Sequence, residues 1–285
     1  WSDGGQVVPP VDLKFMELVK SVEEIKRLNF EQAVKSGMVT IIGTDVDKAY
    51  FEAIRGLSLV KSRSAKVAFS PIHGAGSTNV LPILKAEGFD INVVPEQAKP
   101  DENFPTSVGD LINPEYPEVM DIPIAFGRKL GADLVINSDP DADRIGVAAK
   151  ISLNASDLLF LTGNEVGIAM CHFILSRLKK AGKLTSESLV IETYVTTSLI
   201  SKIARDFGVR AIDDLLVGFK FIGDIIEKLE NKGDFIFAAE ESLGYLRGSF
   251  VRDKDAAISA LTLAELASWL KDENKTLVAY LDEIY

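Results

Sequence analysis

Three aspartates at alternate positions, in the segment Asp139-Pro-Asp-Ala-Asp-Arg144, are the residues best suited to chemistry. In an extended strand the outer two would lie about 13 Å apart, and in a helix positions i and i+2 do not share a face. A bent loop can bring the three carboxylates to one centre, and Pro140 favours that bend. Such oxygen ligands, with no His or Cys nearby, are typical of magnesium. The spacing therefore predicts a Mg²⁺ site at Asp139, Asp141 and Asp143, with a solvated acidic turn as the alternative.

A second polar group, Glu240-Glu-Ser242, directly follows an expected strand. Parallel sheets bind their ligands at the carboxyl ends of the strands. Ionised acceptors beside a hydroxyl suit the several OH groups of a sugar, so Glu240 and Ser242 are predicted to bind substrate. The nearby residues Arg247, Arg252 and Lys254 supply the cationic charge that an anionic ligand needs.

Two further segments offer hydrogen-bond donors for a phosphate group. Arg144 follows the three aspartates, and its planar guanidinium suits a phosphate bound beside the metal. Gly218-Phe-Lys220 stands at the expected start of a helix, where unpaired amides and the helix dipole favour anions. We therefore expect Arg144 to act in catalysis, and Gly218 and Lys220 to contact substrate.

Composition limits the class of protein. The chain has 285 residues and a net charge of -11, which argues against binding to nucleic acid, because that affinity comes mainly from clustered Lys and Arg. No apolar run is long enough to span a bilayer. The single cysteine, Cys171, rules out an intrachain disulfide and fits a reducing compartment. We expect a soluble cytoplasmic protein without membrane or nucleic-acid partners.

The elements that must position these residues follow an α/β pattern. Short β-branched runs alternate with longer amphipathic stretches, which is typical of βαβ units. The pattern predicts two three-layer α/β/α domains with mixed, mostly parallel sheets, each with its own core. The expected strands are 67–69, 91–94 and 134–136 in the first domain and 189–191, 209–212 and 235–237 in the second, with helices at 78–87 and 117–130.

The first 44 residues fit neither of the two expected α/β domains and contain two predicted helices, at 11–28 and 30–36. A charged segment at 271–275 marks the expected end of the second domain. The expected divisions are the tail of a truncated first domain (1–44), an α/β/α domain with the metal loop (45–151), an α/β/α domain with the sugar-recognition loop (152–270), and a linker to a missing C-terminal domain (271–285).

Taken together, these segments resemble the α-D-phosphohexomutases, the phosphoglucomutase and phosphomannomutase family. The segment 139–144 is similar to the family's metal loop, 240–242 to its sugar-recognition loop, and Arg252-Asp-Lys-Asp255 to its phosphate-side segment. The resemblance runs through nearly the whole chain. It implies Mg²⁺-dependent transfer of a phosphoryl group between C1 and C6 of a hexose phosphate, through a hexose bisphosphate, with Lys254 serving the substrate phosphate.

The chain also departs from the family pattern. It lacks the family's Thr-Ala-Ser-His-Asn-Pro phosphoserine loop and its Arg-rich C-terminal domain. Ala239 replaces a glycine before the sugar-recognition loop, and Val217 stands where many members have threonine. The resemblance therefore implies an internal fragment of a four-domain enzyme, which by itself would be inactive.

Two other functions compete with a mutase. In a haloacid-dehalogenase-like phosphotransferase, Asp139 would be the nucleophile and Asp141 the acid/base, while Asp213 and Asp214 would form a metal pair. That interpretation leaves the segment 240–254 unexplained. Alternatively, the chain could be a module that binds a metal and a sugar without chemistry.

Overall fold

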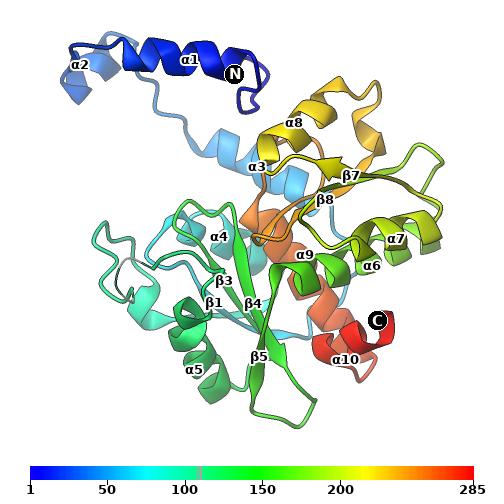
Figure 1. Ribbon diagram of the computed structural model, residues 1–285. Coiled ribbons are helices and arrows are strands. Elements are labelled where there is room, and N and C mark those ends of the chain that lie inside the picture. The colour runs from blue at the N-terminus through cyan, green and yellow to red at the C-terminus, as the bar shows by residue number, and fades with distance from the viewer. Residues whose placement is uncertain (108, 110) are drawn as a thin grey trace.

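The computed structural model describes residues 1–107, 109 and 111–285, and shows two sheets surrounded by helices (Figure 1). Its helices and strands, in chain order, are α1 (Val11–Lys20), α2 (Phe30–Lys35), α3 (Thr44–Arg55), β1 (Lys66–Ser70), α4 (Val80–Ala86), β2 (Asp90–Val93), α5 (Asp121–Leu130), β3 (Leu134–Ser138), β4 (Ile145–Lys150), β5 (Leu158–Leu161), α6 (Gly163–Lys180), β6 (Leu189–Thr193), α7 (Leu199–Asp206), β7 (Arg210–Leu215), α8 (Phe219–Lys228), β8 (Phe235–Glu240), β9 (Gly244–Leu246), α9 (Ala256–Asp272) and α10 (Leu277–Ile284).

The first sheet has the strand order β2-β1-β3-β4-β5. Strand β1 pairs in parallel with β2 and β3, whereas β3-β4 and β4-β5 are antiparallel. Side chains alternate between two layers, as strand geometry requires. Val67 and Phe69 pack in the cluster that contains residues of α4, while Ala68 and Val135 pack with residues of α5. This sheet is therefore the central layer of an α/β/α sandwich, and the predicted fold class is confirmed.

The second sheet has the order β7-β6-β8-β9, with β6 parallel to both of its neighbours and β9 antiparallel to β8. Helices α6 and α7 pack against β6, β7 and β8, and α8 lies across the sheet from them (Figure 1). Thr162 and Glu165 form a capping box that fixes the start of α6. Among the described residues, no helix combines the length and apolar character that a membrane crossing requires.

Helix α9 joins the two halves of the molecule. It packs against α4 and β3 on one side and against α6 and β9 on the other, and lies between the two sheets (Figure 1). Apolar side chains of both sheets, such as Phe69 and Phe237, belong to one continuous buried cluster. The expectation of two separate cores is therefore wrong, because α9 is apolar around nearly its whole circumference and can be buried only between two partners.

Two segments lie differently from their expected places. Strand β5, beyond the boundary expected at residue 151, pairs with β4 in the first sheet. The expected linker, 271–285, contains α10, whose Leu277, Tyr280 and Leu281 are buried against its neighbours. Burial of these apolar side chains removes apolar surface from water, so the segment packs onto the rest of the protein and does not extend away from it.

The predicted helix at 11–28 is shorter in the structure, where α1 ends at Lys20. None of the residues of α1 is buried. An isolated helix of this length gains little from propensity alone, and packing is what normally stabilises it. The prediction of a longer helix is wrong, and residues 21–28 are all exposed, so packing does not stabilise a helix there.

A buried carboxyl group lies in the middle of the second sheet. Glu192 of β6 is 1% exposed, and neither of its carboxylate oxygens makes a well-formed hydrogen bond with the described residues, although Ser201 lies close enough to oppose the rise in pKa. Burial raises the pKa of Glu192 to about 7. The folded protein therefore keeps this carboxyl group protonated at mildly acidic pH.

We expect the stability of the protein to decrease between about pH 4.3, where an unfolded glutamate ionises, and the folded pKa of about 7. In that window the folded state holds a proton that the unfolded state has lost, so rising pH favours unfolding. Glu192→Gln should flatten this dependence and raise the free energy of unfolding at pH 8 by about 1–3 kcal/mol. Denaturant unfolding at several pH values measures both effects. The exposed Glu230→Gln is the control, and a Glu192→Gln profile that matches the wild-type profile would contradict the prediction.

Candidate metal and sugar site

The three aspartates lie in the tight connection between the antiparallel strands β3 and β4. One oxygen of Asp139 accepts hydrogen bonds from the backbone amides of Asp143, at 3.0 Å, and Arg144, at 2.9 Å. Ala142 has a left-handed backbone, with φ of 60°. These features bend the loop as the sequence predicts. One carboxylate oxygen from each of Asp139, Asp141 and Asp143 lies within 4.8 Å of the others.

The electrostatics of this loop fit a bound cation. Burial raises the pKa of Asp139 to about 8, and the charges of Asp143 and Asp141 add to that rise. The Oδ1 atom of Asp143 is buried and accepts no hydrogen bond from the described residues. Three crowded carboxylates, one of which keeps a buried oxygen without a hydrogen bond, suit a hard divalent cation. That Asp139, Asp141 and Asp143 bind a metal remains a prediction.

A glycine in the β1–α4 connection supports the metal loop. A Cβ atom on Gly74 would lie 2.3 Å from the carbonyl oxygen of Pro140. The neighbouring amide of Ala75 donates to the same oxygen at 2.7 Å. The metal loop therefore rests directly on this backbone, and no side chain larger than hydrogen fits between them. Sequence reasoning missed this role, because Pro140 and Gly74 lie far apart along the chain.

Gly74→Ala should displace the metal loop, because the new methyl group overlaps the backbone of Pro140. We expect the free energy of unfolding to fall by about 1–3 kcal/mol, as for other overpacked sites, and the affinity for Mg²⁺ to fall with it. Calorimetric titration and thermal unfolding measure the two effects. The matched control is Gly43→Ala, where a Cβ atom meets nothing within 4 Å. Equal Mg²⁺ affinity in the two variants would show that the contact does not position the loop.

The second group lies at the carboxyl end of β8, as the sequence predicts. Glu240 is the last residue of that strand, and Ser242 lies in the turn that leads to β9. The carboxylate of Glu240 is buried and accepts a hydrogen bond from the amide of Gly218 at 3.0 Å. Burial raises the pKa of Glu240, although the Gly218 amide and the Lys254 ammonium oppose the rise. Gly218 stands immediately before α8, so this bond ties the start of that helix to the sugar-recognition loop.

The two loops touch each other. The amide of Ile145 donates to the carbonyl of Leu243 at 3.1 Å, and the amide of Ala256 donates to that of Ala142 at 3.0 Å. A cavity of about 430 Å³ lies between the metal loop and the segment 250–255, and its lining includes polar side chains that the sequence analysis singled out: Asp141, Asp143, Arg252 and Lys254.

Lys254 connects the two loops electrostatically. Its ammonium group lies 2.7 Å from the Oδ2 atom of Asp143. Burial lowers the pKa of Lys254, but the carboxylates of Asp143 and Asp253 outweigh burial and leave the pKa above its usual value. Lys254 is therefore a charged donor at the edge of the candidate metal site, which sequence spacing could not reveal.

The two arginines near the site are held by carboxylates. Arg144 pairs with Glu115 at 2.8 Å and lies 3.8 Å from Asp143. Arg252 lies 3.8 Å from Asp3 and pairs closely with Glu227. Glu115 and Glu227 were not identified from the sequence, because each comes from a segment distant from its partner. Arg252 lines the cavity of about 430 Å³, and Arg144 lines a hollow on the other side of the metal loop. A phosphate would have to compete with these ion pairs for the guanidinium donors.

Lys220 and Arg247 lie differently from the expectation. Lys220, in the first turn of α8, pairs with Asp12 of α1 at 3.0 Å. Arg247 follows β9, which runs antiparallel to β8, so it lies about three residues along β8 from Glu240, toward the amino end of that strand. The prediction that Arg247 adds cationic charge to the sugar-recognition loop is therefore wrong, because the antiparallel strand β9 leads the chain away from that loop.

The structure also argues against a haloacid-dehalogenase-like arrangement. One oxygen of Asp139 is occupied by two backbone amides, which does not suit a free nucleophile. Asp213, in β7 of the second sheet, pairs with Arg205 at 2.8 Å. Asp213 and Asp214 do not join the acidic cluster of the first sheet within the described part of the chain. The haloacid-dehalogenase-like alternative therefore lacks the metal pair that it needs beside Asp139.

Two sequence models of one family match the chain. The model for phosphoglucomutase/phosphomannomutase alpha/beta/alpha domain II matches residues 48–151. The model for domain III of the same family matches residues 162–285. Both candidate loops fall inside these matches, 139–144 in the first and 240–242 in the second.

Individual relatives agree with the family match. A phosphoglucomutase of Staphylococcus saprophyticus is 29% identical over 99% of this chain and 51% of its own length. A phosphomannomutase of Mycoplasmoides pirum is 29% identical over 98% of this chain and 50% of its own length. The chain thus spans about half the length of these relatives. A solved phosphoglucomutase/phosphomannomutase family protein of Burkholderia thailandensis shares the fold, with a TM-score of 0.65 and 18% identity over 84% of this chain and 46% of that one. The chain belongs to the phosphoglucomutase/phosphomannomutase family and carries its α/β/α domains II and III.

Proposed function

We propose that this chain forms the metal-binding and sugar-binding part of a magnesium-dependent phosphosugar mutase that acts on hexose phosphates. The observation that carries the proposal is the 2.7 Å contact between Lys254 and Asp143, which joins the phosphate-side segment to the acidic loop. A metal ion and a sugar phosphate bound here would be neighbours. The names of the relatives, phosphoglucomutase and phosphomannomutase, support a hexose phosphate as substrate.

The proposed roles follow from the chemistry of each group. Asp139, Asp141 and Asp143 would hold the ion, and bound Mg²⁺ would supply charge neutralisation for a transferring phosphoryl group. Lys254 would bind a substrate phosphate, for which its ammonium is already charged. Glu240 would accept hydrogen bonds from sugar hydroxyls.

The other proposed contacts surround the same sugar phosphate. Ser242, half-buried in the turn after Glu240, would bind a second hydroxyl. Arg144 and Arg252 would exchange their present carboxylate partners for phosphate oxygens, because charge-assisted bonds to a dianion are stronger. Gly218 would keep the sugar-recognition loop in place through its bond to Glu240. Lys220 would have to exchange its ion pair with Asp12 for the substrate.

We expect the 285-residue chain alone to show only background conversion of glucose 1-phosphate, because it contains no phosphoserine loop of the family type. A coupled assay with Mg²⁺ and glucose 1,6-bisphosphate measures this directly. The same assay on a longer protein that includes this chain and the phosphoserine loop should show turnover. Turnover by the 285 residues alone, after exclusion of contaminating enzyme, would contradict the proposal and favour a phosphoryl carrier within the chain.

A further inference from the structure

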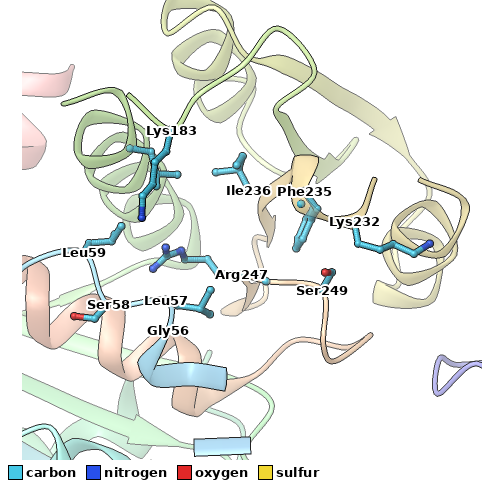
Figure 2. A pocket seen from close by; sticks show the side chains of 13 residues that line it. Gly56, Leu57, Ser58, Leu59, Lys183, Lys232, Phe235, Ile236, Arg247 and Ser249 are labelled. Carbon is cyan, nitrogen blue, oxygen red and sulfur yellow. The ribbon is translucent and has the colours of Figure 1, made fainter. Parts of the chain in front are cut away.

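A second pocket, of about 230 Å³, lies at the amino end of β8 (Figure 2). Glu240 lies at the other end of that strand, roughly 15 Å away at the usual rise of a strand. The pocket shares no lining residue with the cavity beside the metal loop and is therefore separate from it. Its apolar walls come from three parts of the chain, with the side chains of Leu57, Leu59, Leu178, Phe235 and Ile236.

Arg247 lies in this pocket and is unusually short of hydrogen bonds. It is only 5% exposed. Its Nη1 atom donates to the hydroxyl of Thr262 at the long distance of 3.4 Å, and its buried Nε has no partner in the described part of the chain. Burial lowers the pKa of Arg247 to about 10, so the guanidinium is still charged at neutral pH. Burying a cation whose donors lack acceptors costs free energy, unless a ligand accepts hydrogen bonds from those donors.

The carboxylate that influences Arg247 is already engaged. Glu265 attracts Arg247 electrostatically, yet it accepts hydrogen bonds from the amide of Leu59, at 2.8 Å, and the hydroxyl of Ser58. It also pairs with Arg63 at 3.1 Å. One negative charge is thus shared by two guanidinium groups. The described residues that line the pocket include no aspartate or glutamate.

A second cation faces Arg247 across the pocket. The ammonium group of Lys183 points toward the Arg247 guanidinium (Figure 2). Lys183 is exposed, and its ammonium group makes no hydrogen bond or ion pair with any residue that the structure describes; only its backbone amide is bonded, to the carbonyl of Leu178 at 2.9 Å. Lys232 also lines the pocket, but it points away (Figure 2) and donates to the carbonyls of Glu227 and Leu229. Two facing cations repel each other, and an anion placed between them would reverse the sign of that interaction.

We propose that this pocket binds the phosphate group of a small phosphorylated metabolite between Arg247 and Lys183. A dianion matches two cations, and the planar fork of arginine can bond two phosphate oxygens at once. The apolar walls would contact the carbon atoms of the ligand. The volume of about 230 Å³ suits a phosphate group on a short carbon chain rather than a nucleotide. The site is additional to the proposed sugar phosphate crevice and does not depend on it.

Inorganic phosphate is the simplest probe, titrated without Mg²⁺ and followed by calorimetry and thermal unfolding. At about ten times its Kd, phosphate should raise the Tm by roughly 3 to 5 °C. Lys183→Gln, on the exposed rim, should weaken binding about fivefold or more, since one charge-assisted bond is lost. Arg247→Met should abolish the response. Lys254→Gln, in the other crevice, should retain it. Glycerol 3-phosphate should bind at least as tightly as inorganic phosphate.

Several outcomes would overturn the proposal. One is a phosphate response in Lys183→Gln and Arg247→Met equal to that of the wild type. Another is an equal rise in Tm with potassium chloride at matched ionic strength. Loss of the response in Lys254→Gln alone would place the phosphate in the other crevice. Binding of inorganic phosphate but not of glycerol 3-phosphate would exclude a phosphorylated metabolite. If Arg247→Met does not fold, Lys183→Gln decides the question alone.

Discussion

Asp141→Asn should weaken Mg²⁺ binding by about tenfold or more, because one of three anionic ligands becomes neutral. Asp141 is exposed and makes no hydrogen bond or ion pair in the described part of the chain, so its replacement removes no support for the loop. Its charge also helps to raise the pKa of Asp139. Without metal, the variant should therefore be as stable as the wild type or slightly more stable.

The test is specific because Asp141→Asn should lower the Mg²⁺ affinity without lowering the stability of the metal-free protein. Calorimetric Mg²⁺ titration gives the affinity, and thermal unfolding with and without Mg²⁺ gives the stability. Asp45→Asn is the control, since its side chain is 98% exposed and lies outside the acidic cluster. Equal Mg²⁺ affinity in Asp141→Asn and the wild type would show that the acidic loop is not the metal site.

Glu240→Gln should lower the affinity for glucose 1,6-bisphosphate by about tenfold to a hundredfold, the usual cost of losing a hydrogen bond to a charged group. The amide oxygen of glutamine can still accept the bond from Gly218, so the loop should keep its conformation. The variant therefore separates the charge of Glu240 from its structural contact. Titration of the bisphosphate in the presence of Mg²⁺ measures the effect.

The neighbouring Glu241→Gln is the matched control for that change. Glu241 accepts hydrogen bonds from the hydroxyls of Thr193 and Thr196, so its carboxylate faces the body of the domain. Its replacement should lower the stability and leave sugar affinity nearly unchanged. If both variants bind the bisphosphate as the wild type does, Glu240 is not a sugar ligand.

Much of this architecture could be predicted from the sequence. Strands such as β3, buried at every position, appear as continuous apolar runs, and glycines such as Gly131 end helices in a left-handed conformation. Residues that follow such strands lie at a sheet edge, which is why the acidic loop and the segment 240–242 were found. The bend of the acidic loop followed from the spacing of its charges alone.

Contacts between distant segments could not be predicted in this way. The pairing of Lys254 with Asp143 depends on how the two halves dock. The same holds for Gly163 of α6, where a Cβ atom would lie 1.9 Å from the carbonyl oxygen of Glu241. The sequence analysis placed Arg247 beside the sugar-recognition loop because hydrophobic periodicity does not reveal that the short strand β9 pairs antiparallel with β8. Each of these features depends on tertiary packing, which local patterns do not encode.

A crystal soaked with Mn²⁺ and glucose 1,6-bisphosphate would locate both the metal and the sugar, because Mn²⁺ accepts the same oxygen ligands as Mg²⁺ and gives an anomalous signal. We expect one anomalous peak bounded by Asp139, Asp141 and Asp143, and sugar hydroxyls against Glu240 and Ser242. A peak away from the acidic loop, or a sugar that contacts neither Glu240 nor Ser242, would contradict the proposed site.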